Sequence, residues 1–491
     1  MRLSGIINKI DDLINPIVVK EIRQSINSRT IYAIIIGVLL LELGGLLIFM
    51  SDGIRERNSG QGYFVMLLVI LMLGYFLGVG MSAAGRFANE RDKSSMDLMH
   101  ATVLSPYSII WGKIFSSMVM VVFIFSLCVP FMCVSYFLQG IDIVTILSWC
   151  YISFVIALPT VTGCLLLGTL GSSKGMRGLI IFVIVFILWT GISPLLFHYG
   201  GPTISGLGDS LATLIWTTFY CLAVSGLFYF FAVSIVSHVS SNRAFCLRYY
   251  IAVLWLASLV IAALYALHMG SVDPFEIWFV QMSLIAVVIT GFAPAERLVQ
   301  SRRVLKSVPD GKWRRFVHFL FSSGAVNAIL FGVCMMLLNC GVLFLATTCW
   351  NEIYGSSSKD TSELLQIFSG IFAYILFYSF FAITLKLGFN RFFPNVNGMV
   401  YSLFVVGACM LIPVVIEVLR SFDQIGSHSE SPYMFILSPL IFTNDSMRSV
   451  GMIVSAALAA LGLLLHFSLI KSSLKVHRRL MPETVTVKEH E

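Results

Sequence analysis

Twelve apolar runs of membrane-spanning length constrain this chain more than any other feature of its sequence. A helix needs about 20 apolar residues to cross the hydrocarbon core of a bilayer. Because only 12% of the residues are charged, against roughly a quarter in soluble proteins, a soluble globular fold is excluded. We therefore expect an all-α integral membrane protein with about twelve transmembrane helices. The expected spans are 30–50, 62–84, 114–137, 144–170, 179–198, 211–236, 249–269, 275–294, 321–348, 364–385, 397–418 and 449–470.

The basic residues predict which loops face the cytoplasm, since cytoplasmic loops are enriched in Lys and Arg. With the N-terminus inside, 27 of the 32 Lys and Arg residues fall in cytoplasmic segments. This asymmetry favours an even number of spans with both termini in the cytoplasm. It also accounts for the net charge of +7, so nucleic acid is not an expected partner.

A polar segment at 89–113 interrupts the apolar runs of the first half. It begins with the charged residues Glu90, Arg91, Asp92 and Lys93. Ser94 and Asp97 then have the spacing of a helix capping box, and Met96, Met99 and Val103 recur on one helical face. The pattern predicts a short amphipathic helix at the cytoplasmic membrane surface, near 94–103.

A second amphipathic pattern lies in residues 1–29. Asn15 followed by Pro16 is a typical helix start, with Asn as N-cap and Pro at the first helical position. The polar side then carries Lys20, Glu21, Arg23 and Gln24. Such a helix is expected to lie in the plane of the membrane interface. The alternative is a basic segment that only sets the topology.

Both patterns resemble segments of ABC-2 type transporter permeases. The first intracellular loop of that family has an acidic-basic cluster, a short helix, a Leu-Ser-Pro turn and a Gly-Lys pair before the third span. Here the turn ends in Ser105 and Pro106 and the pair is Gly112 and Lys113. Residues 15–30 are similar to the elbow helix before span 1. Val103 departs from the proline common in the family, and Ser94-Ser95 replace a common Gly-Thr.

The resemblance implies an exporter in a cell inner (plasma) membrane, energised by a separate ATPase subunit that binds ATP and Mg. In that family the helix of the first loop is a coupling helix, which docks into a cleft on the ATPase. The ATPase-coupling loop would comprise Glu90, Arg91, Asp92, Met96, Asp97, Met99, Ser105, Pro106 and Lys113. The elbow helix would comprise Asn15, Pro16, Lys20, Glu21 and Arg23.

Catalytic and cofactor motifs are not apparent in the sequence. The nearest approach to the nucleotide-binding pattern GxxxxGK[ST] lies within an apolar run and lacks the Lys, and no hydrolase or zinc-ligand pattern occurs. We therefore expect that the chain is not an enzyme and binds no cofactor or metal itself.

The span pattern predicts four parts: an elbow segment at 1–29, a six-span ABC-2-like permease module at 30–236, a second six-span module at 237–470, and a cytoplasmic tail at 471–491. In each half the longest cytoplasmic loop follows the second span, but the sequences of the two loops, 85–113 and 295–320, do not match. One chain could therefore supply two halves of a path. Alternatively, the second module is an unrelated extension, and two chains pair as a homodimer or with a second permease.

The loop at 295–320 is strongly basic. It is expected to meet anionic membrane lipid, with a second contact surface for an ATPase as the alternative.

Ionisable residues within the spans are candidates for function, because each costs about 2.5–3.5 kcal/mol on insertion scales. Glu42 in span 1 could contact a polar substrate or carry a proton, or it could instead bond a neighbouring helix or a buried water. His466 is expected to be a satisfied packing residue, and Lys386 to snorkel to the interface. Gly74 and Gly78 form a GxxxG pattern that predicts close helix packing, within the chain or across a dimer.

Two other classes of function remain open. An ion-coupled secondary transporter would use intramembrane acids such as Glu42, although the scarcity of charges in the spans counts against it. A non-transporting membrane assembly or anchor protein would have the same composition. The sequence does not select a substrate.

Overall fold

The computed structural model confirms a multi-pass, all-α membrane protein. It describes residues 16–52, 59–92, 105–138, 141–169, 207–238, 241–296, 302–354, 359–389 and 448–479, and four positions between 401 and 407. Within these residues ten helices are long and apolar enough to cross a membrane. They correspond to ten of the twelve expected spans. The remaining two, 179–198 and 397–418, lie outside the described residues apart from those four positions, so the number twelve stays a prediction.

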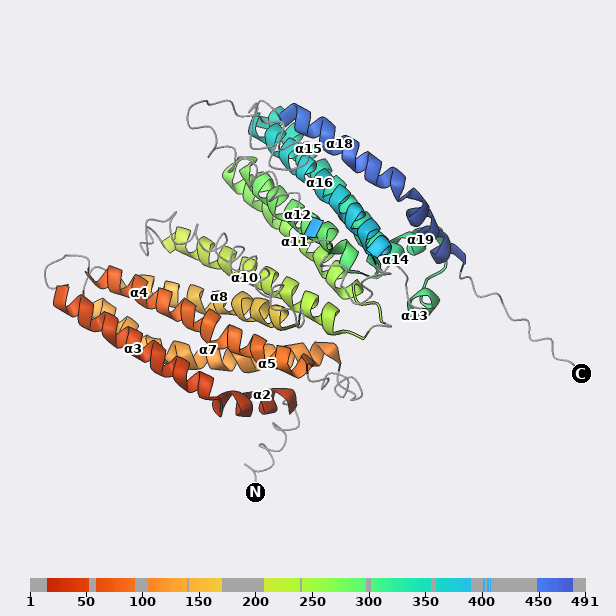
Figure 1. Cartoon of the computed structure of the whole chain (residues 1–491). Helices are drawn as coiled ribbons and strands as arrows, with labels where there is room; N and C mark the ends of the chain where they lie inside the picture. Colours follow the sequence, from red (N-terminus) through yellow and green to blue (C-terminus); the bar gives the residue numbers. More distant parts are fainter. Residues whose placement is uncertain are drawn as a thin grey trace, which may run out of the picture. The chain divides into compact units, whose positions relative to one another are not determined.

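The chain divides into two compact units, residues 1–238 and 239–491, which are described separately (Figure 1). The predicted boundary between the two six-span modules falls at 236, and their assignment as an ABC-2-like module and a second module stays a prediction.

The first unit begins with a short surface helix and continues with long apolar helices. Its elements are α2 (Pro16–Ile26), α3 (Arg29–Asp52), α4 (Ser59–Leu73), η1 (Gly74–Gly80), α5 (Met81–Asp92), α7 (Pro106–Phe137), α8 (Ile143–Thr169) and α10 (Leu207–Val236). Helix α8 packs against α5, α7 and α10, and α2 packs against α7. Because 72% of the most apolar window of α8 is buried, against 17% for α3, α8 is the central helix of the unit.

Span 2 is one continuous helix whose middle turns, η1, are π-helical. Its glycines allow close approach by three neighbouring helices. A Cβ added at Gly78 would lie 2.7 Å from Ile34 Cγ2 of α3, and one at Gly80 would lie 2.6 Å from Cys164 Sγ of α8. The GxxxG face is therefore used for packing within the chain.

The second unit contains α11 (Phe245–Met269), α12 (Asp273–Phe292), η2 (Ala293–Ala295), α13 (Arg302–Lys306), α14 (Lys312–Phe321), α15 (Ala325–Tyr354), α16 (Lys359–Phe389), α18 (Arg448–Leu465) and α19 (Phe467–Arg479). Helix α12 packs against α11, α15 and α16, and α16 also packs against α18. The basic loop at 295–320 thus holds two short helices. Amphipathic α14 ends just before span α15 begins, as α2 ends just before α3.

The contact between α5 and α8 yields a test of the packing in the first unit. A Cβ added at Gly168 would lie 2.7 Å from the carbonyl oxygen of Ala84, a backbone atom that cannot move without shifting α5. Because overpacking costs about 1–3 kcal/mol, Gly168→Ala is expected to lower the melting temperature of the detergent-purified protein. Gly37→Ala is the matched control, since a Cβ there meets no atom within 4 Å. Equal melting of the two variants would contradict the close approach of α5 and α8.

Candidate functional site

The residues of the predicted coupling loop fall on both sides of a gap in the described chain. Met96, Asp97 and Met99, with the whole helix expected at 94–103, lie outside the described residues, as does Asn15. Arg91 and Asp92 are the last residues of α5, and only their backbone is described. The structure describes Glu90 at the end of α5. At the start of α7 it describes Ser105, Pro106 and Lys113. The structure therefore shows the two ends of the loop.

The start of α7 has a well-formed N-cap. Ser105 has extended backbone, and its side-chain oxygen accepts a hydrogen bond of 3.2 Å from the backbone N–H of Ser108. Pro106 is the first helical residue, where its missing N–H costs nothing. Because Lys113 follows about two helical turns later, this cap fixes the direction in which α7 presents it.

A buried group of charges joins helix α2 to both ends of the loop. The Lys113 ammonium donates to Glu21 Oε1 of α2 and, at 2.7 Å, to Glu90 Oε2 of α5. Lys20 of α2 also donates to Glu90, through its other carboxylate oxygen, at 3.1 Å. Arg86 of α5 lies 4.0 Å from Glu21. We call these five residues, Lys20, Glu21, Arg86, Glu90 and Lys113, the Lys113 cluster.

The cluster differs from an ordinary surface ion pair because its centre is out of solvent. Only 4% of the Lys113 side chain and 4% of the Glu21 side chain are exposed. The Lys113 ammonium also lies 4.9 Å from the centroid of the Phe87 ring, which adds a cation–π contact. Removing one partner of a buried ion pair costs about 3–5 kcal/mol, because the other charge is left uncompensated. Helices α2, α5 and α7 are therefore held together at this end of the unit.

Sequence reasoning singled out four members of the cluster but assigned them to two separate elements. Lys20 and Glu21 were expected on an interfacial elbow, and Glu90 and Lys113 on a coupling loop; that they meet was not predicted. Arg86 was missed. Its spacing of four residues from Glu90 places the two side chains on one face of α5, which is the signal that could have found it. Arg23, the third charged residue of the predicted elbow, is exposed on α2 and lies outside the cluster.

Glu42 lies in the interior of the first unit. It is fully buried on α3, and neither carboxylate oxygen has a hydrogen-bond partner among the described residues. Its polar surroundings are the Cys128 thiol of α7 and the Tyr63 phenol of α4, whose hydroxyl is likewise without a hydrogen bond in the described part of the chain. The structure thus brings Glu42 together with polar groups of two neighbouring spans.

The second unit contains a comparable buried cation that the sequence did not reveal. Arg248, near the start of α11, donates through Nη2 to both carboxylate oxygens of Glu296, at 2.6 and 2.7 Å. Its Nη1 donates to the carbonyl oxygens of Leu320, at 2.8 Å, and Ser322 in the turn between α14 and α15. Glu296 also accepts from the backbone N–H of Gly324. Amphipathic α14 is therefore tied to the bundle by buried polar contacts, as α2 is in the first unit.

Two further expectations from the sequence have different outcomes. His466 is buried, stacks on Phe380, and hydrogen-bonds Thr384 at 2.8 Å, so it is a satisfied packing residue as expected. That Lys386 snorkels to the interface stays a prediction. Its ammonium donates to the carbonyl oxygens of Pro294 in η2, at 2.7 Å, and of Glu296, at 3.2 Å.

The positive charge on α14 comes from Lys312, Arg314 and Arg315. Burial lowers the pKa of His318 on the same helix below its ordinary value, so this imidazole is neutral at pH 7.

Among the described residues, no group of three or more His, Cys, Asp or Glu side chains is arranged to hold a metal ion. No family model, curated protein or solved structure matches this chain.

The Lys113 cluster yields a matched pair of substitutions. Lys113→Met leaves buried Glu21 without its closest partner and is expected to cost about 3–5 kcal/mol of stability, seen as a lower melting temperature in detergent. Lys20→Met removes a lysine whose side chain is 62% exposed and is expected to cost at most about 1 kcal/mol.

The double variant Glu21→Leu/Lys113→Met removes both buried charges and is expected to regain much of the lost stability. Equal melting of the two single lysine variants would show that the Lys113 ion pairs do not hold α2 to α5 and α7.

Proposed function

We propose that this chain is the membrane-spanning permease subunit of an ATP-driven ABC-2 type transporter, an exporter in a cell inner (plasma) membrane. A separate ATPase subunit docks on the cytoplasmic loop at 85–113 and binds the ATP and Mg. The resemblance of this loop and of the elbow to the family motivates the proposal, and the Lys113 cluster supports it.

The cluster is the observation that carries the proposal. A coupling helix works only if a push on the loop moves the spans on both sides of it. Glu90 and Lys113 stand at the two ends of the loop, and their ion pair joins the end of span 2 to the start of span 3. The pair of Lys113 with Glu21 adds the elbow helix to the same group. A force on the loop would therefore move α2, α5 and α7 together.

The path of this motion into the membrane follows from the packing of span 2. Helix α5 continues through η1 into α4, and its glycines hold it close to α3 and α8. A π-helical segment within an α-helix is rare and often marks a functional position. In the proposed mechanism, closure of the ATPase pushes the helix near 94–103, the cluster moves as a body, and η1 is where span 2 bends.

The docking step is tested by Met96→Ala/Asp97→Ala. Affinity purification of the tagged chain from its native membranes is expected to recover an ATPase with the unchanged protein and roughly tenfold less with the variant, equivalent to about 1.4 kcal/mol of binding free energy. Lys471→Ala is the control, because Lys471 is an exposed residue of α19 and belongs to neither long cytoplasmic loop. Recovery of the same amount of ATPase with both variants would show that the loop is not the docking element.

A second candidate function, an ion-coupled secondary transporter, is favoured by Glu42 alone. A fully buried carboxyl inside a span, with a thiol and a phenol as its polar neighbours, is a candidate proton carrier. This function predicts that the chain, purified without any ATPase, moves its substrate when a proton gradient is imposed, and that Glu42→Gln abolishes this movement. Both results together would replace the ATP-driven mechanism.

A further inference from the structure

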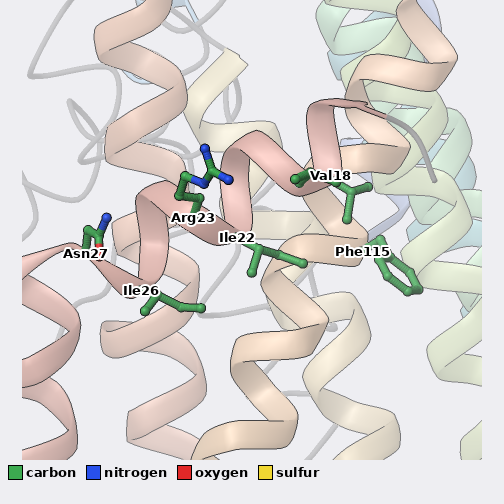
Figure 2. Close-up of a pocket in the computed structure, with 7 residues that line it drawn as sticks. Val18, Ile22, Arg23, Ile26, Asn27 and Phe115 are labelled. Carbon is green, nitrogen blue, oxygen red and sulfur yellow. The ribbon is translucent and has the colours of Figure 1, made fainter. Parts of the chain in front are cut away.

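The elbow helix α2 has an apolar groove on the side that the Lys113 cluster does not use. The groove has a volume of about 390 Å³ and is formed by α2 together with Phe115 of α7. Figure 2 shows Ile22 and Ile26 projecting from one side of α2, with Phe115 beyond them, and Arg23 projecting from the other. Arg23 and Asn27 are the polar residues of its lining.

The apolar side chains of the groove are not covered by the first unit itself. Val19, Ile26 and Phe115 are each about half exposed. Fully exposing side chains of this size to water costs about 1.5–3 kcal/mol each relative to burying them. The groove therefore needs an apolar occupant or an apolar solvent.

The position of the groove along the chain indicates that its occupant is a membrane lipid. Helix α2 ends at Ile26 and the first span begins at Arg29, so α2 cannot lie far from the membrane boundary. Phe115 itself belongs to a span, Pro106–Phe137. The groove thus opens where the head groups of a bilayer meet its acyl chains.

The charges around the groove favour a lipid with an anionic head group. The Lys113 cluster contains three cationic and two anionic residues, and is therefore positive by one charge. Arg23 lines the groove and is exposed, and the ion pairs among the described residues do not include it. A guanidinium can donate two parallel hydrogen bonds to a phosphate, and each basic residue near an anionic membrane surface contributes about 1 kcal/mol.

We propose that this groove is a specific site for one phospholipid with an anionic head group. One acyl chain lies along Val19, Ile22, Ile26 and Phe115, and Arg23 and Asn27 hydrogen-bond the phosphate. The site holds α2 to the membrane on the side opposite the cluster. It does not depend on the proposed transport function, since any membrane protein with this surface would bind the lipid.

The test uses native mass spectrometry of the full-length chain purified in detergent and titrated with phosphatidylglycerol or with phosphatidylcholine of the same acyl chains. The unchanged protein is expected to retain one phosphatidylglycerol molecule at roughly tenfold lower lipid concentration than phosphatidylcholine. Arg23→Gln should abolish this preference, and Ile26→Trp, which fills the groove, should weaken binding of both lipids by a similar factor. Glycerol phosphate, which has the head-group chemistry without acyl chains, should not compete.

Two matched controls distinguish the groove from the general lipid-facing surface. Arg29→Gln removes an exposed arginine that does not line the groove, and Ile36→Trp enlarges an exposed apolar residue of α3 away from it. Both should bind phosphatidylglycerol as the unchanged protein does. Equal retention of the two lipids, competition by glycerol phosphate, or equal losses in the control variants would each overturn the proposal. All four substitutions are at exposed positions, so the folded protein remains available for the measurement.

Discussion

The arrangement of the first unit depends on one ammonium group that has been taken out of water. Lys113 lies in an apolar helix, and burying its charge without partners would cost several kcal/mol. Glu21 and Glu90 compensate that charge, and they come from two other elements, α2 and α5. If either carboxylate moved away, the buried ammonium would lose part of its compensation. The three segments, which are separate in the sequence, are therefore expected to move together. Breaking one of these pairs would leave a buried charge uncompensated, so the arrangement of the three segments, including both ends of the loop, is strongly specified.

In the second unit a buried cation also connects an amphipathic helix to the bundle, but the residues and their order along the chain differ. Amphipathic α14 runs directly into span α15, and its last turn is held by Arg248, which comes from the start of an earlier span. In the first unit the buried cation instead comes from a later span than the amphipathic helix. The two units therefore share a physical requirement, a polar connection between a surface helix and its bundle, without sharing a sequence pattern.

The sequence predicts the spans well because an apolar run of membrane length has few alternatives in a bilayer. It predicts α2 for a similar local reason, the Asn15-Pro16 start followed by helical periodicity. It does not predict that Glu21 meets Lys113, because hydrophobic periodicity says which residues face inward but not which helices become neighbours. Gly74 and Gly78 read as an ordinary GxxxG pattern, and the π-helical turns between them depend on packing by α3, α7 and α8. Helix α14 could have been predicted from the sequence, because Trp313, Phe316 and Val317 recur at helical spacing among basic residues.

Helix α2 is held on one face by the buried charges of the cluster, and in our proposal its other face is held by a bound phospholipid. Rotation of α2 about its own axis would pull Glu21 away from Lys113. It would also move Ile22 and Ile26 away from Phe115, on the other wall of the groove. Movement along the membrane plane together with α5 and α7 would preserve both sets of contacts. A push on the loop would therefore be transmitted as a concerted displacement of these three helices relative to α8. At Gly80 and Gly168 span 2 and α8 approach each other closely, so such a displacement would change these contacts.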